Sequence, residues 1–328
     1  MEKKRIFLFD NMKFFLIMTV VIGHFIDQQI KYPAYKSLFL FIYAFHMPLF
    51  IFISGIFHKN KKILEKALVY ILLGYLLKLF IFYTRRGLGE TPKLQFLSDS
   101  GAAWFMFAMA AFMFISYYLR DIDKRFVLIL SIFLGCIVNY DTSIGDYLYL
   151  SRIVVFFPFY HLGTMLDVDT VYTITERKRN KVIGTVILLI WAFVCVFLLE
   201  NVYDLRFVFT GRNSFSKEWY VYGAFVRLVC YTVTAVVSFS LLCVMPNREI
   251  PGWTRFGART MQVYFWHRPI VYVLTSFGVP VMMCKTTISK MFYIIIAVVL
   301  TYLLSSKVFA FPTEPILKMR DKLNVRSN

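Results

Sequence analysis

Charged residues are scarce in this sequence. They make up 17% of the 328 residues, and only 19 of them are acidic. Hydrophobic residues make up 59%, and the mean hydropathy is +0.63. A soluble domain of this length neither needs nor could cover so much apolar surface. The composition therefore argues against a soluble fold and indicates a membrane protein.

The motifs of several enzyme classes are also missing. The five cysteines are scattered and form no CxxC pair, so we expect buried thiols rather than disulfides or zinc ligands. The histidines form no HxxxH or HExxH pattern, which argues against a metal site. There is no phosphate-cradling glycine loop and no GxSxG elbow. We expect neither a bound metal nor a bound cofactor.

Uninterrupted apolar blocks of about 17–25 residues fill the chain, which is the length of a membrane-spanning helix. A transmembrane β-barrel would show short alternating segments instead. The pattern predicts an all-α bundle of about ten transmembrane helices in one domain over residues 1–328, ending in a short basic cytoplasmic tail at 311–328. The first apolar run is too long for a signal peptide, so we expect a retained span. The predicted spans are 7–27, 37–57, 66–83, 102–119, 125–140, 151–167, 182–199, 220–245, 258–280 and 290–310.

The distribution of Lys and Arg predicts the orientation of the spans. The termini and alternate loops together hold 23 basic residues, whereas the opposite loops hold 11. The positive-inside rule therefore places both ends in the cytoplasm, as expected for a multi-pass protein of the plasma membrane. The net charge of +18 could suggest a nucleic-acid-binding protein. The basic residues alternate with the spans, however, so they indicate the topology and face anionic lipid. We expect the bilayer as a partner and no nucleic acid, and a homo-oligomer is left open.

The first predicted span carries an unusual polar stripe. Lys13 and His24 are eleven residues apart, which is three helical turns or about 16 Å on nearly the same face. Asp10 lies one turn before Lys13, and Asp27 one turn after His24. If Asp10 and Asp27 lie in the two membrane–water interfaces, their carboxylates need no functional explanation. His24 lies deeper, and an ionisable group at that depth is costly enough to be a functional candidate.

Further polar groups fall within other spans. His46 lies beside Pro48, and a proline in mid-span opens the backbone ladder, while Ser54-Gly55 indicates a close helix contact. His161 also follows a proline, but a structural role as a hydrogen-bonded packing residue explains it at least as well as a catalytic role. The remaining candidates are Trp104 at an interface, Arg227, and the pair His267 and Arg268.

Taken in order, these motifs resemble the acyltransferase-3 family of membrane acyltransferases, and most closely its branch of fucose 4-O-acetylase-like sugar acetyltransferases. The resemblance rests on Asp10-x-x-Lys13 with His24 eleven residues later, and on the segment from Phe45-His46-Met47-Pro48 to Ser54-Gly55. Further landmarks follow in the right order: Trp104-Phe105, Phe157-Pro158-Phe159 with Gly163, and Tyr264 to His267.

The resemblance implies a bacterial enzyme with about ten helices, cytoplasmic acyl-CoA (most often acetyl-CoA) as donor, and a hydroxyl of a cell-surface polysaccharide or lipid-linked sugar as acceptor. The family has arginine where this chain has Lys13. Lysine keeps the charge but loses the planar fork that holds a phosphate in two places.

As a mechanism, we expect His24 to act as general base, with its tautomer fixed by Asp27 or by His267 and Arg268. A covalent acyl-histidine and direct transfer both stay open. The donor phosphates would meet Lys13, with help from Arg255 or Arg259, and the adjacent Asp10 is assigned to the same donor-binding site. The competing class is a transporter, which also buries charges, and a non-catalytic assembly subunit is a third alternative. The residues assigned to the substrate cavity are His46, Trp104, His161, Arg227, His267 and Arg268.

Overall fold

A computed structural model of the chain describes residues 6–98 and 101–318, and the regular elements within this part are all helices. The longer helices are α1 (Leu8–Asp27), α2 (Pro33–Tyr43), α3 (His46–Ile56), α4 (Ile63–Gly87), α5 (Trp104–Tyr118), α6 (Lys124–Ile137), α7 (Leu150–Thr164), α9 (Lys178–Phe197), α12 (Gly223–Val244), α13 (Thr260–Ser276) and α15 (Thr287–Leu304). The shorter ones are α8 (Val168–Thr175), α10 (Leu199–Val202), α11 (Leu205–Phe209) and α14 (Val279–Met283). The predicted tail at 311–328 lies outside the described residues from 319 onward.

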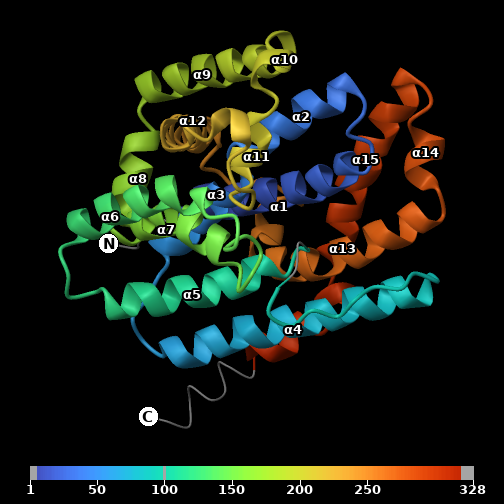
Figure 1. Cartoon of the computed structure of the whole chain (residues 1–328), viewed down its shortest axis with the longest axis horizontal. Coiled ribbons are helices and arrows are strands. Elements are labelled where there is room, and N and C mark those ends of the chain that lie inside the picture. The colour runs from blue at the N-terminus through green and yellow to red at the C-terminus, as the bar shows by residue number, and fades with distance from the viewer. Residues whose placement is uncertain (1–5, 99–100, 319–328) are drawn as a thin grey trace.

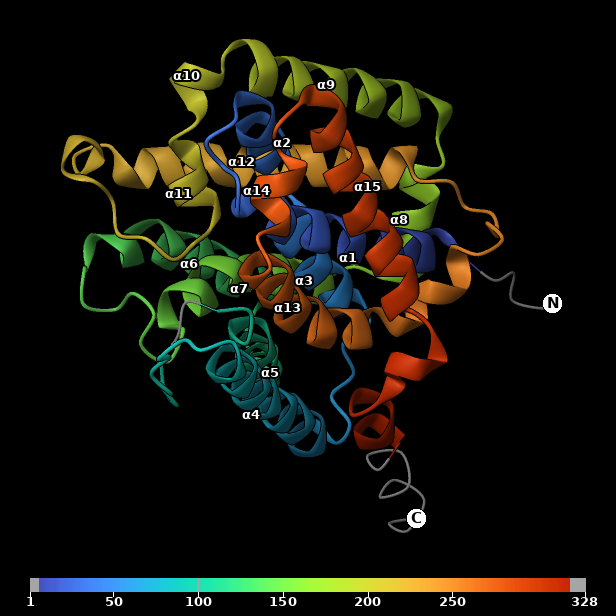
Figure 2. The same ribbon diagram turned by 90° about the vertical axis from the view of Figure 1, so that its right-hand side faces the viewer.

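The polar stripe of the first span lies at the centre of the bundle. α1 packs against α2, α3, α13 and α15, and most of its residues are buried. α9 and α12 pack together on one side of this centre, and α4 and α5 on the other, as Figures 1 and 2 show. Of the stripe, Asp10, Lys13 and His24 are partly buried by this packing, whereas Asp27 at the end of α1 is exposed.

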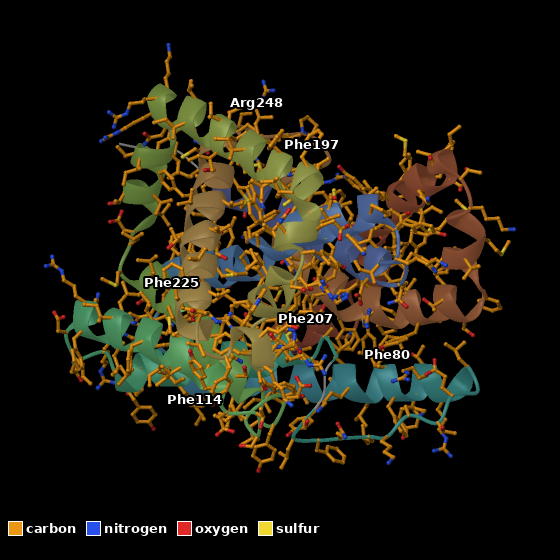
Figure 3. The ribbon with its side chains drawn as sticks, turned by 45° about the horizontal axis from the view of Figure 1, so that its top comes forward. Phe80, Phe114, Phe197, Phe207, Phe225 and Arg248 are labelled. Atoms are coloured by element: carbon orange, nitrogen blue, oxygen red, sulfur yellow. The ribbon has the colours of Figure 1, made fainter. Side chains whose placement is uncertain are left out.

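The outer surface is apolar. Phe197 on α9 and Phe225 on α12 have exposed fractions of 70% and 67% and project from the bundle (Figure 3). Within the described residues, six segments are long and apolar enough to cross a bilayer: Leu8–Asp27, Pro33–Ile56, Ile63–Gly87, Lys178–Phe197, Gly223–Val244 and Thr287–Leu304. A membrane protein follows from this surface, while about ten crossings stay a prediction.

The second predicted span is interrupted, but not at its proline. The chain leaves helical geometry at Phe45, between α2 and α3, where φ is −134°. Pro48 lies in the first turn of α3, where a backbone N–H has no partner within the helix and its loss costs nothing. The opening therefore comes just before the proline and places His46 at the start of the new helix.

The predicted close contact at Ser54-Gly55 is confirmed. α3 crosses α7 at Gly55 and Gly163, which lie so close that a Cβ atom on Gly55 would stand 2.1 Å from the carbonyl oxygen of Tyr160. A Cβ atom on Gly163 would stand 2.2 Å from the carbonyl oxygen of Phe52. Only glycine fits either position, and the crossing fixes how α3 lies in the bundle.

Candidate functional site

A cavity of about 210 Å³ lies between α1, α2, α3, α5, α7, α13 and the segment that follows α11. We call it the histidine cavity. Its polar lining consists of His24, Asp27, Tyr43, His46, Trp104, Arg152, Thr210, Arg212, Asn213, Tyr264 and Arg268. The fold therefore brings together residues from both halves of the chain that the sequence offered only as separate candidates.

His24 contacts the predicted pair on α13. Nη1 of Arg268 lies 3.3 Å from Nδ1 of His24, and the ring of His24 stacks on that of His267 with 5.1 Å between ring centroids. No hydrogen bond joins His24 to Asp27 in the described part of the chain, although Asp27 lines the same cavity. Of the two partners considered for His24, the structure thus brings Arg268 and His267 to it.

His267 and His46 are each held by a backbone carbonyl. Nδ1 of His267 donates to the carbonyl oxygen of Tyr264 at 2.7 Å, and His267 is fully buried. Nδ1 of His46 donates to the carbonyl oxygen of Ile42 at 2.9 Å. Because a carbonyl can only accept, both Nδ1 atoms carry the proton in the neutral rings, which leaves each Nε2 with a lone pair.

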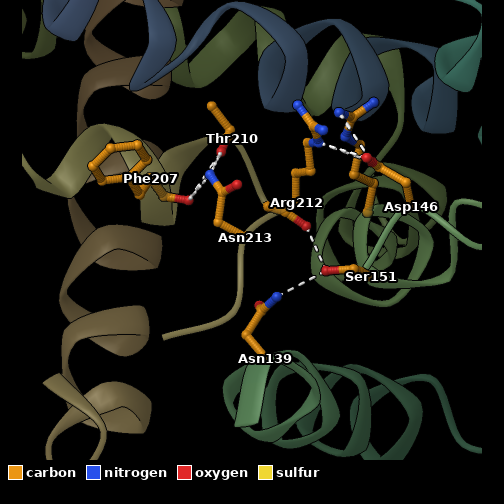
Figure 4. A network of polar contacts seen from close by, with 9 residues as sticks. Asn139, Asp146, Ser151, Phe207, Thr210, Arg212 and Asn213 are labelled. Atoms are coloured by element: carbon orange, nitrogen blue, oxygen red, sulfur yellow. Dashed lines mark hydrogen bonds and ion pairs between the residues drawn. The ribbon is translucent and has the colours of Figure 1, made fainter. Parts of the chain in front are cut away.

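An arginine–carboxylate network forms another wall of the cavity (Figure 4). Nε of Arg212 lies 2.9 Å and 2.7 Å from the two carboxylate oxygens of Asp146, and Nη2 of Arg152 lies 3.6 Å from one of them. The guanidinium of Arg152 also lies over the ring of Trp104, 4.9 Å from its centroid. Asp146 thus orients two cationic side chains of the cavity without lining it itself.

Arg227 lies behind this wall rather than in the cavity. Its guanidinium donates to the carbonyl oxygen of Val208 and, at 2.6 Å, to Oδ1 of Asn139. Asn139 in turn donates to Ser151, which donates to the carbonyl oxygen of Gly211 (Figure 4). The buried charge therefore fastens the segment that carries Arg212, and its cost is offset by these hydrogen bonds.

A second cavity of about 330 Å³ lies beside the other end of α1. We call it the lysine cavity. Its polar lining consists of Lys13, Ser54, His58, Lys59, Lys66, Tyr70, Tyr160, Thr260 and Tyr264. Lys13 forms an ion pair with Asp10 at 2.9 Å, so Asp10 lies beside this cavity without lining it. The three lysines make this cavity basic, which favours anionic over neutral ligands.

His58 bridges the wall of the lysine cavity. Its Nδ1 lies 2.8 Å from the hydroxyl of Tyr160 and its Nε2 lies 2.8 Å from Oδ1 of Asn60. Burial lowers the pKa of His58, its hydrogen bond to Asn60 opposes this, and the nearby charge of Lys66 lowers the pKa further. The ring is therefore neutral at pH 7.

Tyr264 lines both cavities. Its ring packs on Phe105 with 5.1 Å between centroids, and its hydroxyl donates to the carbonyl oxygen of Ala102 at 2.5 Å. Tyr264 of α13, packed on Phe105 of α5, thus contributes to the walls of both cavities.

Six predicted residues line neither cavity: Asp10, His161, Arg227, Arg255, Arg259 and His267. Arg255 lies over the ring of Phe256, and Arg259 donates to the carbonyl oxygen of Ser305 at 2.9 Å. His161 donates through Nε2 to the carbonyl oxygen of Lys124 at 3.0 Å, which is the packing arrangement considered for it.

Other lining residues were not selected from the sequence: Tyr43, His58, Lys59, Lys66, Arg152, Arg212 and Asn213. The lysines were read only as topology signals, and the arginines fall in or next to predicted loops. Among the described residues, no three His, Cys, Asp or Glu side chains are grouped to hold a metal ion.

The fold and the cavities define a polytopic membrane protein with a basic ligand cavity and a histidine–arginine site within one bundle. The family model Acyl_transf_3, described as an acyltransferase domain, matches residues 7–306. The chain belongs to this family and is a membrane acyltransferase of the O-acyltransferase type, which decides against a transporter. Searches of curated proteins and of solved structures gave no match.

Proposed function

We propose that this enzyme transfers an acetyl group from acetyl-CoA to a hydroxyl of a cell-surface or lipid-linked sugar at the plasma membrane of a bacterium, as in the fucose 4-O-acetylase-like branch. The observation that carries the proposal is the pair of cavities that share Tyr264, one lined by lysines and the other by histidines and arginines. A phosphate-rich donor and a neutral hydroxyl acceptor need two such different environments.

The donor binds in the lysine cavity. Phosphates of acetyl-CoA contact Lys13, Lys59 and Lys66, which carry the charge that such a ligand requires. By the distribution of basic residues this cavity faces the cytoplasm, where acetyl-CoA is found. The thioester arm passes the ring of Tyr264 to reach the histidine cavity.

The acceptor sugar binds in the histidine cavity. Trp104 and Tyr43 offer aromatic faces, and Arg212 and Asn213 offer hydrogen bonds to hydroxyl groups. Attack of a hydroxyl on a thioester needs a group that takes its proton, and an imidazole is suited to this at neutral pH. His24 lies beside Arg268 at this cavity, so removal of its imidazole in His24→Ala strongly reduces transfer.

Purified protein in detergent with radiolabelled acetyl-CoA and a pool of bacterial surface sugars tests the proposal. We expect acceptor-dependent label transfer that is lost in His24→Ala and retained in His161→Gln, whose histidine lines neither cavity. A folded wild-type protein that binds acetyl-CoA but transfers acetyl to no sugar would contradict the acceptor class. Full activity of His24→Ala would contradict the site.

A further inference from the structure

We infer that His46 takes the proton of the acceptor hydroxyl through Nε2, and that His24 instead donates a hydrogen bond from its Nε2–H to the thioester carbonyl. This division of roles rests on the proposed function and assigns the two histidines of the histidine cavity to opposite tasks. It follows from the hydrogen bonds that fix each ring.

The tautomer of His24 is set by Arg268. A guanidinium has only N–H groups to offer, so the 3.3 Å contact with Nη1 of Arg268 requires a lone pair on Nδ1 of His24. The proton of the neutral ring is then on Nε2, which makes that nitrogen a donor. Turning the ring over would place a C–H group against the guanidinium and lose the contact. His24 is thus arranged to stabilise negative charge rather than to accept a proton at Nε2.

His46 has the opposite arrangement. The break between α2 and α3 lets the imidazole of His46 bond the carbonyl oxygen of Ile42, the position a backbone N–H would occupy in a continuous helix. Nδ1 is therefore the donor, and Nε2 carries the lone pair. His46 lines the cavity, and the ring of Tyr43 packs against it with 4.6 Å between centroids, which fixes its orientation.

His267 has the same tautomer as His46 but lies out of reach. Its Nδ1 donates to backbone carbonyls, and its Nε2 has no hydrogen-bond partner in the described part of the protein. The side chain is fully buried and does not line the cavity. Its stacked ring supports His24 from behind and makes it a positioning residue.

The step balances with these roles. The acceptor oxygen attacks the thioester carbonyl carbon while its proton moves to Nε2 of His46, and the carbonyl oxygen gains charge that Nε2–H of His24 and the adjacent charge of Arg268 stabilise. The carbon–sulfur bond then breaks, and the thiolate of CoA takes the proton from His46. The products are the sugar ester and free CoA thiol, and both histidines return to their starting state.

Two amide replacements separate the roles. The amide nitrogen of asparagine lies close to the position of Nδ1, so His46→Asn keeps the donor to Ile42 but has no base. The amide nitrogen of glutamine lies close to the position of Nε2, so His24→Gln keeps a donor there. We expect His46→Asn to lose about 10²–10⁴-fold in kcat. His24→Gln should stay within about tenfold of wild type, whereas His24→Ala, which lacks the donor, loses about 10²–10³-fold.

The outcomes distinguish this inference from the proposed function. If wild-type protein transfers acetyl to no sugar, the function fails first. If wild type is active, His46→Asn keeps full activity and His24→Gln is inactive, then His24 is the base and the inference is overturned. Loss of activity in Asp27→Asn with His46→Asn unaffected would assign the base to Asp27 and overturn it too. Acetyl-CoA binding and thermal unfolding of each variant, with His161→Gln as the control, exclude misfolding as the cause.

Discussion

The crossing of α3 and α7 allows a prediction that depends on geometry alone. A Cβ atom added to Gly55 would stand 2.1 Å from the carbonyl oxygen of Tyr160 and 3.0 Å from Cα of Gly163. Non-bonded atoms rest at about 3.5–4.0 Å, so Gly55→Ala requires the two helices to separate by roughly 1 Å or more. Overpacking of this kind costs about 1–3 kcal/mol, and backbone atoms cannot move aside as a flexible side chain can.

We therefore expect Gly55→Ala to lower the thermal unfolding midpoint in detergent, and Gly163→Ala to do the same. Because both changes force the same separation, the double variant should lose less than the sum of the two single losses. Gly87→Ala is the matched control, since it ends α4 and a Cβ atom there meets nothing within 4 Å. An unchanged midpoint for Gly55→Ala would refute the packing argument.

Three further predictions concern the cavities. Lys13→Gln should raise the KM for acetyl-CoA about 2–5-fold, as expected for the loss of a partly exposed charge. The effect should be smaller at high salt and absent for an acetyl thioester without phosphates. An equal rise in KM for both donors would contradict phosphate binding. Asp146→Asn removes the negative charge and one of the two oxygens that hold Arg212 and Arg152, so the KM for the sugar acceptor should rise about tenfold, or about 1.4 kcal/mol. The KM for acetyl-CoA should stay constant in the same assay. The pKa of His58 is lower in the folded protein than in the unfolded chain, so the folded state binds fewer protons and its stability falls as the pH drops below about 6.5. Unfolding measured between pH 7 and 5 should show this fall, and His58→Gln should reduce it; an identical pH dependence in both proteins would contradict it.

The lipid environment explains why the helices could be predicted. A membrane span must satisfy its backbone internally over a fixed thickness, so hydropathy and length alone define segments such as 7–27 and 182–199, which match α1 and α9 closely. The sequence predicts an opening of the helix at Pro48, but the structure has the break just before His46. The reason is that proline is accommodated in the first turn of a helix. The short helices α10 and α11 were missed because the loop that contains them has no span-length apolar run.

The same cost of burying charge explains which site residues could be predicted. It singled out His24, His46, His267 and Arg268, all of which lie in or beside the histidine cavity. It also singled out Arg227, whose buried charge has a structural role that hydropathy cannot tell from a catalytic one.

The sequence by itself determined the membrane class, the approximate spans, the family and the polar stripe of α1, because each depends on composition or on spacing within one helix. The tertiary structure alone decided that His24 lies against Arg268, 244 residues away, and that Lys59 and Lys66 join Lys13 at one cavity. Which helices are neighbours depends on close packing across the bundle, such as the contact of Gly55 with Gly163, and this is not encoded in the order of the segments. The hydrogen bonds that set the tautomers of His24 and His46 exist only after that packing is complete.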